Sequence, residues 1–173
     1  MIGTSNTVHN FNKSISVGDY GEQIIKSYFE TNPNIVDVID VSKDKTYQDK
    51  DIDFIVKLKS GENISVELKT DTYDTGNIFY EAISNQEYNV LGCMIKSKAK
   101  CLFYYFIKTK ELYIIDFKEY KKWVNKNNAR FAKKRIKNIN RCGNEITHSV
   151  GLLIPKRVFE KEMVGYFNKK IVG

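Results

Sequence analysis

The stretch DIDFIVKLKSGENISVELKT, residues 51–70, has the pattern of two β-strands joined by a turn. Apolar residues occupy every second position in much of both halves. Because side chains along a strand alternate between the two faces of a sheet, each half has one apolar face. The polar segment 60–63 supplies the turn. Folded as an antiparallel hairpin, the two strands carry Asp53, Glu67 and Lys69 on polar faces that can meet.

Length and composition limit the kind of protein that carries this hairpin. With 173 residues and 42% hydrophobic content, the chain can bury one sizeable core, so we expect a single domain over residues 1–173 with an N-terminal tail at residues 1–16. No apolar run is long enough for a membrane span, and the polar N-terminus lacks the apolar core of a signal peptide. We therefore expect a cytoplasmic protein with no membrane partner.

Residue usage adds two expectations. Cys93, Cys101 and Cys142 are odd in number and form no C-x-x-C pair, which argues against a disulfide framework and against a zinc ribbon. The abundance of Lys, Asn, Ile and Tyr, with only 2 Pro, favours a bacterial or phage origin. The expected location is thus a bacterial cell or a phage-infected bacterium.

Basic charge is concentrated in one segment, which we expect to be helical. Residues 118–141 hold ten of the 28 Lys and Arg and one of the 21 Asp and Glu. Aromatic residues are interleaved with these cations, as expected for a surface that binds a phosphate backbone. A solvated helix whose aromatic residues face the core fits the same pattern. The candidate nucleic-acid contacts are Lys121, Lys122, Arg130, Lys133, Lys134 and Arg135.

The order of elements resembles a known family. A helix with Glu22, a strand with Asp53, a hairpin and a strand with Glu67-Leu68-Lys69 resemble the PD-(D/E)xK nuclease superfamily over roughly residues 18–107. The resemblance implies an α/β fold, with a restriction-endonuclease-like core in which a central mixed, mostly antiparallel sheet is flanked by helices. The segment KTDTYDTGNIFYE and SKA at 97–99 further look like phage and bacterial endonucleases related to Holliday-junction resolvases.

The resemblance also implies residue roles. Asp53 and Glu67 would bind the metal, Lys69 would assist the attacking water, and Glu22 would be an accessory acid on the first helix. One departure from the family pattern is Ile52, which stands where the name-giving Pro would be.

The chemistry of phosphodiester hydrolysis supports these roles independently. The reaction needs charge neutralisation at the scissile phosphate and a deprotonated water, and Mg²⁺ held by a few carboxylate oxygens supplies both. Asp53 and Glu67 would provide these oxygens, with Mn²⁺ as a substitute metal. Lys69 follows Glu67 by two residues and so lies on the same strand face, where its charge can stabilise the transition state.

Other interpretations of the same residues stay open. A cross-strand salt bridge between Lys69 and Asp53 or Glu67 is a common surface arrangement, and E-x-K recurs by chance at residues 119–121. Asp51 could replace Asp53 as a ligand, although a solvated turn residue is more usual there. Glu81 could line the cleft or be an exposed strand residue.

The sequence therefore predicts a magnesium-dependent deoxyribonuclease that acts as an endonuclease on DNA. No histidine motif for metal binding or a catalytic triad is present, and no glycine-rich loop suggests a nucleotide cofactor. The alternative is a non-catalytic protein on the same fold, such as a nucleic-acid-binding, phage inhibitor or accessory protein. An RNA-directed module is a third interpretation. A homodimer that presents two sites to two DNA strands is compatible with the sequence.

Overall fold

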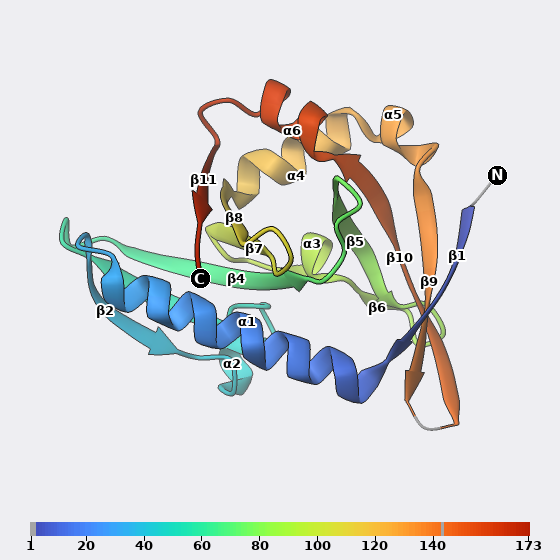
Figure 1. Cartoon of the computed structure of the whole chain (residues 1–173), viewed down its shortest axis with the longest axis horizontal. Coiled ribbons are helices and arrows are strands. Elements are labelled where there is room, and N and C mark those ends of the chain that lie inside the picture. Colours follow the sequence, from blue (N-terminus) through green and yellow to red (C-terminus); the bar gives the residue numbers. More distant parts are fainter. Residues whose placement is uncertain (1–2, 143) are drawn as a thin grey trace. The chain divides into compact units, whose positions relative to one another are not determined.

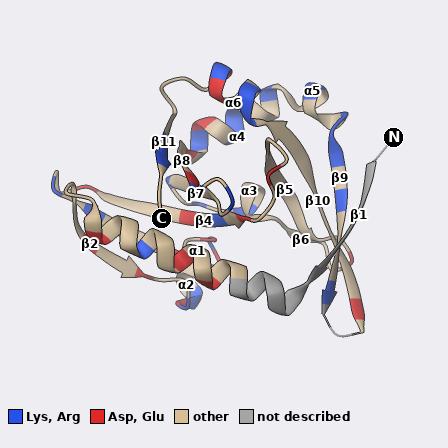
Figure 2. Ribbon diagram, viewed as in Figure 1, with Lys and Arg blue, Asp and Glu red and all other residues tan. Residues whose placement is uncertain are grey.

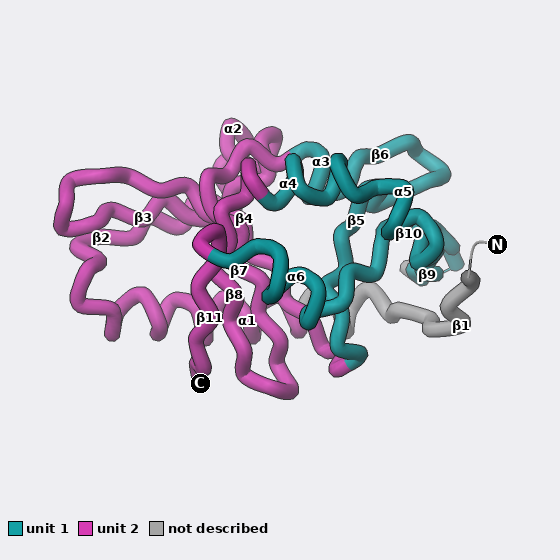
Figure 3. The backbone as a smooth tube through the Cα atoms, turned by 90° about the horizontal axis from the view of Figure 1, so that it is seen from above, with its two compact units in different colours: residues 1–16, 75–96, 120–164 teal, residues 17–74, 97–119, 165–173 magenta. Residues whose placement is uncertain are grey.

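The chain divides into two compact units, each with its own β-sheet (Figure 3). The computed structural model describes the backbone of residues 3–142 and 144–173 and the side chains of residues 17–141 and 144–173. Unit 1 comprises residues 1–16, 75–96 and 120–164, and unit 2 comprises residues 17–74, 97–119 and 165–173. The single domain over residues 1–173 that the sequence predicts stays a prediction.

Unit 2 contains a six-stranded sheet with the strand order β11-β8-β7-β4-β3-β2 (Figure 1). Its strands are β2 (Ile35–Asp40), β3 (Phe54–Leu58), β4 (Asn63–Asp71), β7 (Cys101–Phe106), β8 (Glu111–Asp116) and β11 (Phe167–Ile171). Its helices are α1 (Phe11–Thr31), from residue 17 onward, and α2 (Lys45–Gln48). Only β4 and β7 are parallel neighbours. The mixed α/β class and the mixed, mostly antiparallel sheet are thus confirmed.

The core of unit 2 follows from the alternation in the hairpin. Phe54 pairs with Val66 across β3 and β4, and both side chains are buried against Ile25 and Phe29 of α1. The Phe29 and Phe54 ring centroids are 5.4 Å apart. The apolar faces of both strands therefore lie under α1, and the side chains between them point to the opposite face of the sheet.

Unit 1 contains a five-stranded sheet with the strand order β1-β9-β10-β5-β6. Its strands are β1 (Gly3–Asn10), β5 (Asn77–Asn85), β6 (Val90–Leu91), β9 (Arg135–Cys142) and β10 (Glu145–Pro155). Its helices are α3 (Cys93–Lys96), α4 (Phe117–Lys126) from residue 120 onward, α5 (Asn128–Ala132) and α6 (Lys156–Glu162). The pairs are antiparallel except β1 with β9.

Two predicted segments have a different structure. Residues 1–16 were expected as a tail; residues 3–16 form β1 and the start of α1, and residues 1 and 2 lie outside the described residues. The basic segment is helical only to residue 132, and residues 135–141 belong to β9. Pairing explains the difference, because β9 bonds to β10 on one side and to β1 on the other, so its conformation depends on partners distant in the sequence.

No helix among the described residues is long and apolar enough to cross a membrane.

Candidate active site

Asp53 lies immediately before β3, where the chain leaves the regular ladder with β4. Its backbone N–H donates to Val66 O at 2.8 Å, and its carbonyl accepts from Val41 N at 2.9 Å. Its carboxylate accepts a hydrogen bond from Leu68 N at 2.7 Å. The Asp53 side chain thus reaches β4 between Glu67 and Lys69, the two residues that flank Leu68.

Glu67 and Lys69 lie on the sheet face opposite α1. Val66 belongs to the core beneath α1, so the alternation of β4 turns Glu67 and Lys69 to the other face. Glu67 is buried, with 7% of its surface exposed. Phe54 lies opposite Val66 in the antiparallel pair of β3 and β4. Asp53 precedes Phe54 and Glu67 follows Val66, so the two acids are neighbours across the strands.

The same face carries a second acid farther along β4. Lys69 pairs with Tyr104 of β7 in the parallel register. The Tyr104 hydroxyl donates to Asp71 Oδ2 at 2.8 Å. This hydrogen bond fixes Asp71 against the sheet, two residues beyond Lys69.

The charges around Asp53 are mainly negative. Burial raises the pKa of the Asp53 carboxyl to about 6, and Glu22, Asp51 and Asp40 add to the rise, while the hydrogen bond from Leu68 N opposes it. Burial also raises the pKa of Glu22. These carboxylates come from α1, β2 and the turn before β3, and a cation would relieve their mutual repulsion.

Lys26 connects two of these acids. Its Nζ lies 2.7 Å from Asp40 Oδ2 and 3.8 Å from Glu22 Oε2. Burial opposes ionisation of Asp40, but hydrogen bonds from Lys26 and Ser42 outweigh it and lower its pKa to about 2. Lys26 therefore holds an ionised Asp40 beside α1.

A glycine brings α1 close to β4. A Cβ atom on Gly21 would lie 2.0 Å from Thr70 Oγ1 and 2.9 Å from Thr70 Cβ, so any larger residue would require Thr70 to move. Glu22 follows Gly21 and is thereby held near the end of β4 that carries Lys69. Glu22, the predicted accessory acid, is therefore part of the acidic surroundings of Asp53. Its negative charge is one of the causes that raise the pKa of Asp53.

The residues present fit a metal site with two protein carboxylates. Mg²⁺ usually keeps several waters and takes one or two carboxylates together with substrate phosphates. Asp53 and Glu67 could supply such a pair. Across the described part of the chain, no group of three or more His, Cys, Asp or Glu residues is arranged to hold a metal ion, so a cage built from protein ligands alone does not fit.

The two additional predicted acids have other surroundings. Asp51 has a φ of 45° in the turn before β3, and Ser97 Oγ donates to its carbonyl at 2.7 Å. The positive φ breaks the strand alternation, so Asp51 contributes to the field at Asp53 without belonging to the β3 face. Glu81 lies on β5 of unit 1, where Cys93 Sγ is 4.0 Å from its Oε2.

The six predicted nucleic-acid contacts lie in unit 1 and differ in their surroundings. Lys122, Lys133, Lys134 and Arg135 are exposed, whereas Lys121 is partly buried. Arg130 is exposed but ion-paired, with Nη1 2.7 Å from Glu162 Oε1.

Sequence reasoning missed Lys26 and Asp40. The spacing of Glu22 and Lys26, four residues apart on a helix, gave a weak signal for an ion pair. Nothing local connected either residue to Asp40, which approaches them only when β2 joins the sheet. The exposed basic residues of α6 were also missed because α6 lies outside the basic segment.

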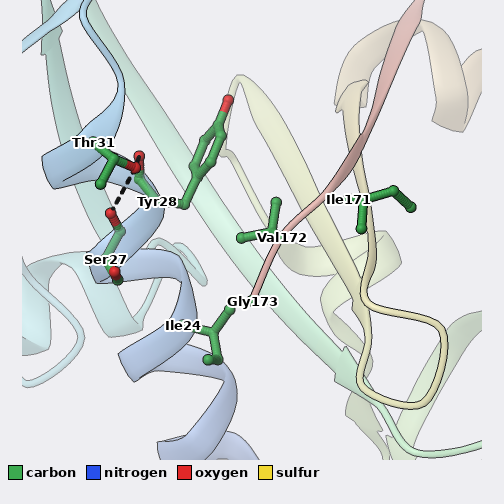
Figure 4. A pocket seen from close by; sticks show the side chains of 7 residues that line it. All are labelled: Ile24, Ser27, Tyr28, Thr31, Ile171, Val172 and Gly173. Carbon is green, nitrogen blue, oxygen red and sulfur yellow. Dashed lines mark hydrogen bonds between the residues drawn. The ribbon is translucent and has the colours of Figure 1, made fainter.

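A small pocket lies elsewhere in unit 2. It has a volume of about 220 Å³ and lies between α1 and the C-terminal residues 171–173. Figure 4 shows Tyr28 and Val172 among its lining side chains, and the Thr31 hydroxyl donates to Ser27 O at 3.0 Å. No charged side chain lines this pocket.

Comparisons of the chain with protein-family models, with curated proteins and with solved structures found no match.

Proposed function

We propose that this protein is a metal-dependent endonuclease that hydrolyses phosphodiester bonds in DNA. The observation that carries the proposal is the Asp53 carboxylate, hydrogen-bonded to Leu68 N at the point where β4 presents Glu67 and Lys69. The mixed sheet with α1 on one face supports the proposal, in which this sheet is the core of a restriction-endonuclease-like fold.

Each residue of this group has a distinct role in the proposal. Asp53 and Glu67 would hold Mg²⁺, which when bound supplies charge neutralisation and a more acidic water. Lys69 would place its ammonium group beside the reacting phosphate, where negative charge develops in the transition state. Glu22 would keep the surroundings of Asp53 acidic and so favour cation binding over a vacant site.

Unit 1 supports DNA as the substrate. It holds 14 Lys and Arg against 5 Asp and Glu, a net charge of +9, and cations of α4, α5, α6 and β9 colour its ribbon in Figure 2. A polyanion gains affinity from such a surface because bound counterions are released. The acidic group of unit 2 would then act on a phosphate backbone that unit 1 retains.

One observation favours a second function, that of a non-catalytic nucleic-acid-binding, inhibitor or accessory protein. In the described ranges, no three metal-ligating side chains form a group. A protein retained only for binding needs no such group, and its basic surface would be sufficient.

A cleavage assay separates the two functions. Purified protein is incubated with linear, nicked, single-stranded and four-way DNA, and with RNA, in Mg²⁺, Mn²⁺ or excess EDTA. We expect internal cleavage of DNA with either metal and none in EDTA. Hydrolysis in EDTA would contradict the metal mechanism, and binding without cleavage would favour the second function. Asp53→Asn protein purified in parallel controls for contaminating nucleases.

A further inference from the structure

The helices of unit 1 pack their aromatic residues inward. Tyr120, Phe131 and Phe159 have 0%, 2% and 0% of their surface exposed. Trp123 is partly buried between them, with its ring centroid 5.2 Å from that of Phe131 and its Nε1–H donating to Glu162 at 3.2 Å. The aromatic residues that interleave with the basic residues therefore hold α4, α5 and α6 together.

The same helices turn their cations outward. Exposed Lys and Arg side chains occur on all three helices and on the connection to β9. These are Lys122, Lys126, Arg130, Lys133, Lys134, Arg157 and Lys161. Arg157 and Lys161 are four residues apart on α6 and so share one helix face. Phe159 lies between them in sequence and packs against Tyr120, with ring centroids 5.4 Å apart.

We infer that the outer surface of α4, α5 and α6 binds the backbone of double-stranded DNA, and that α6 contributes Arg157 and Lys161. The inference rests on the proposed function for its choice of nucleic acid as the partner. We call this surface the helical docking surface.

The choice of duplex over single strand follows from the aromatic residues. Proteins that bind single strands stack bases on exposed aromatic side chains. In the described part of α4, α5 and α6, none of the large hydrophobic residues is exposed. Recognition is then left to phosphate contacts, and duplex DNA offers these at the higher density.

Arg130 contributes less to DNA binding by this surface than its charge suggests. Glu162 accepts from both Trp123 and Arg130, which ties α6 to α4 and α5. The Arg130 guanidinium thus has a carboxylate partner already, whereas among the described side chains neither Arg157 nor Lys161 forms a short ion pair. The docking surface therefore includes two residues of α6 that the basic segment alone does not contain.

The test uses the full chain in EDTA, so that binding is measured without cleavage. Fluorescence anisotropy gives the affinity for a labelled 20-base-pair duplex and for one of its strands at several salt concentrations. The variant carries Arg157→Gln and Lys161→Gln. The matched control carries Lys57→Gln and Lys59→Gln, two exposed lysines of unit 2.

We expect the wild type to bind duplex more tightly than single strand. The Arg157→Gln, Lys161→Gln variant should lower the slope of log affinity against log salt by about 2 units for duplex, because two fewer counterions are released. The control should keep the wild-type slope. Thermal unfolding of both proteins establishes that they fold.

Each contrary result has a separate meaning. An unchanged slope in a folded α6 variant would overturn the role of Arg157 and Lys161. Single strand bound as tightly as duplex would overturn the choice of substrate. A wild type that binds no nucleic acid at any salt concentration would overturn the inference together with the proposed function, whereas intact binding without cleavage would leave the inference standing.

Discussion

The two units carry their charges in different ways. Unit 1 has a net charge of +9, and many of its cations are exposed, whereas unit 2 has 14 Lys and Arg against 16 Asp and Glu. In unit 2 the acids that matter for the proposal are partly or fully buried. A buried charge interacts strongly with its few neighbours, while exposed charges are screened and act together. Substitutions in unit 2 should therefore change chemistry, and those in unit 1 should change affinity.

The largest expected effect is the loss of cleavage in unit 2. Asp53→Asn or Glu67→Gln removes the charge of a proposed metal ligand and keeps its volume. We expect the cleavage rate to fall by at least about 10²- to 10³-fold, as when other groups that stabilise transition-state charge are removed, with DNA affinity nearly unchanged. Rates and affinities are measured on the same DNA.

Glu119→Gln is the matched control, because residues 119–121 repeat the E-x-K pattern outside the predicted site. This variant should cleave at the wild-type rate. Wild-type cleavage by either Asp53→Asn or Glu67→Gln would mean that the site has been assigned to the wrong residues.

A second prediction separates rate from affinity at Lys69. Lys69→Met should lower kcat by about 10²-fold and change KM less, because its charge is needed mainly where the transition state develops. Steady-state kinetics in Mg²⁺ measure both constants. Equal losses in rate and affinity would make Lys69 a residue that only binds the phosphate. Substitutions in unit 2 would then change affinity as well as chemistry.

The sequence located this group because its members obey strand alternation. Apolar positions at Phe54 and Val66 define the buried face of the hairpin, so the opposite face carrying Glu67 and Lys69 follows from local pattern alone. Asp40 could not be found in this way, because its contact with Lys26 joins β2 to α1. Such a contact depends on how distant elements pack.

The remaining misassignments have a similar physical cause. β1 and β9 are polar segments without apolar alternation, and their strand conformation depends on each other and on β10. The two compact units do not follow from the sequence pattern either, because unit 1 is assembled from three separate segments. Composition along the chain gives no boundary when the chain passes repeatedly between units.

A third prediction concerns the stability of unit 2 and its dependence on pH. An aspartate carboxyl has an ordinary pKa of 3.8, as expected in the unfolded chain, whereas the pKa of Asp53 in the folded protein is about 6. Between these pH values the unfolded chain loses its proton first, so the contribution of Asp53 to the free energy of unfolding falls as the pH rises from about 4 to above 6. A shift of about two pKa units corresponds to about 3 kcal/mol in the free energy of unfolding.

Asp53→Asn should therefore raise the free energy of unfolding at pH 7.5 by up to about 3 kcal/mol and should have little effect at pH 4. Denaturant unfolding at both values measures the difference. Asp49→Asn, a change at an exposed residue beside α2, is the control. A variant that is less stable than wild type at pH 7.5 would show that the buried charge is already compensated.

The smallest expected effect tests a buried polar group of unit 1. Among the described side chains, the Tyr120 hydroxyl is buried without a hydrogen-bond partner, whereas Tyr80 donates to Met94 O at 3.2 Å. Their rings lie 5.7 Å apart in one cluster. An unpaired buried hydroxyl costs about 1–3 kcal/mol, so Tyr120→Phe should raise the free energy of unfolding by about 1 kcal/mol.

Tyr80→Phe should instead lower the free energy of unfolding, because it leaves the Met94 carbonyl without its donor. Thermal unfolding of the two single variants at one pH compares them directly, and DNA affinity should stay at the wild-type value in both. If Tyr120→Phe destabilised the protein, its hydroxyl would have a partner in solution, such as a buried water. A loss of DNA affinity in a stable Tyr120→Phe protein would show that the interior of unit 1 also shapes its binding surface, and binding in that unit would then depend on more than its exposed charge.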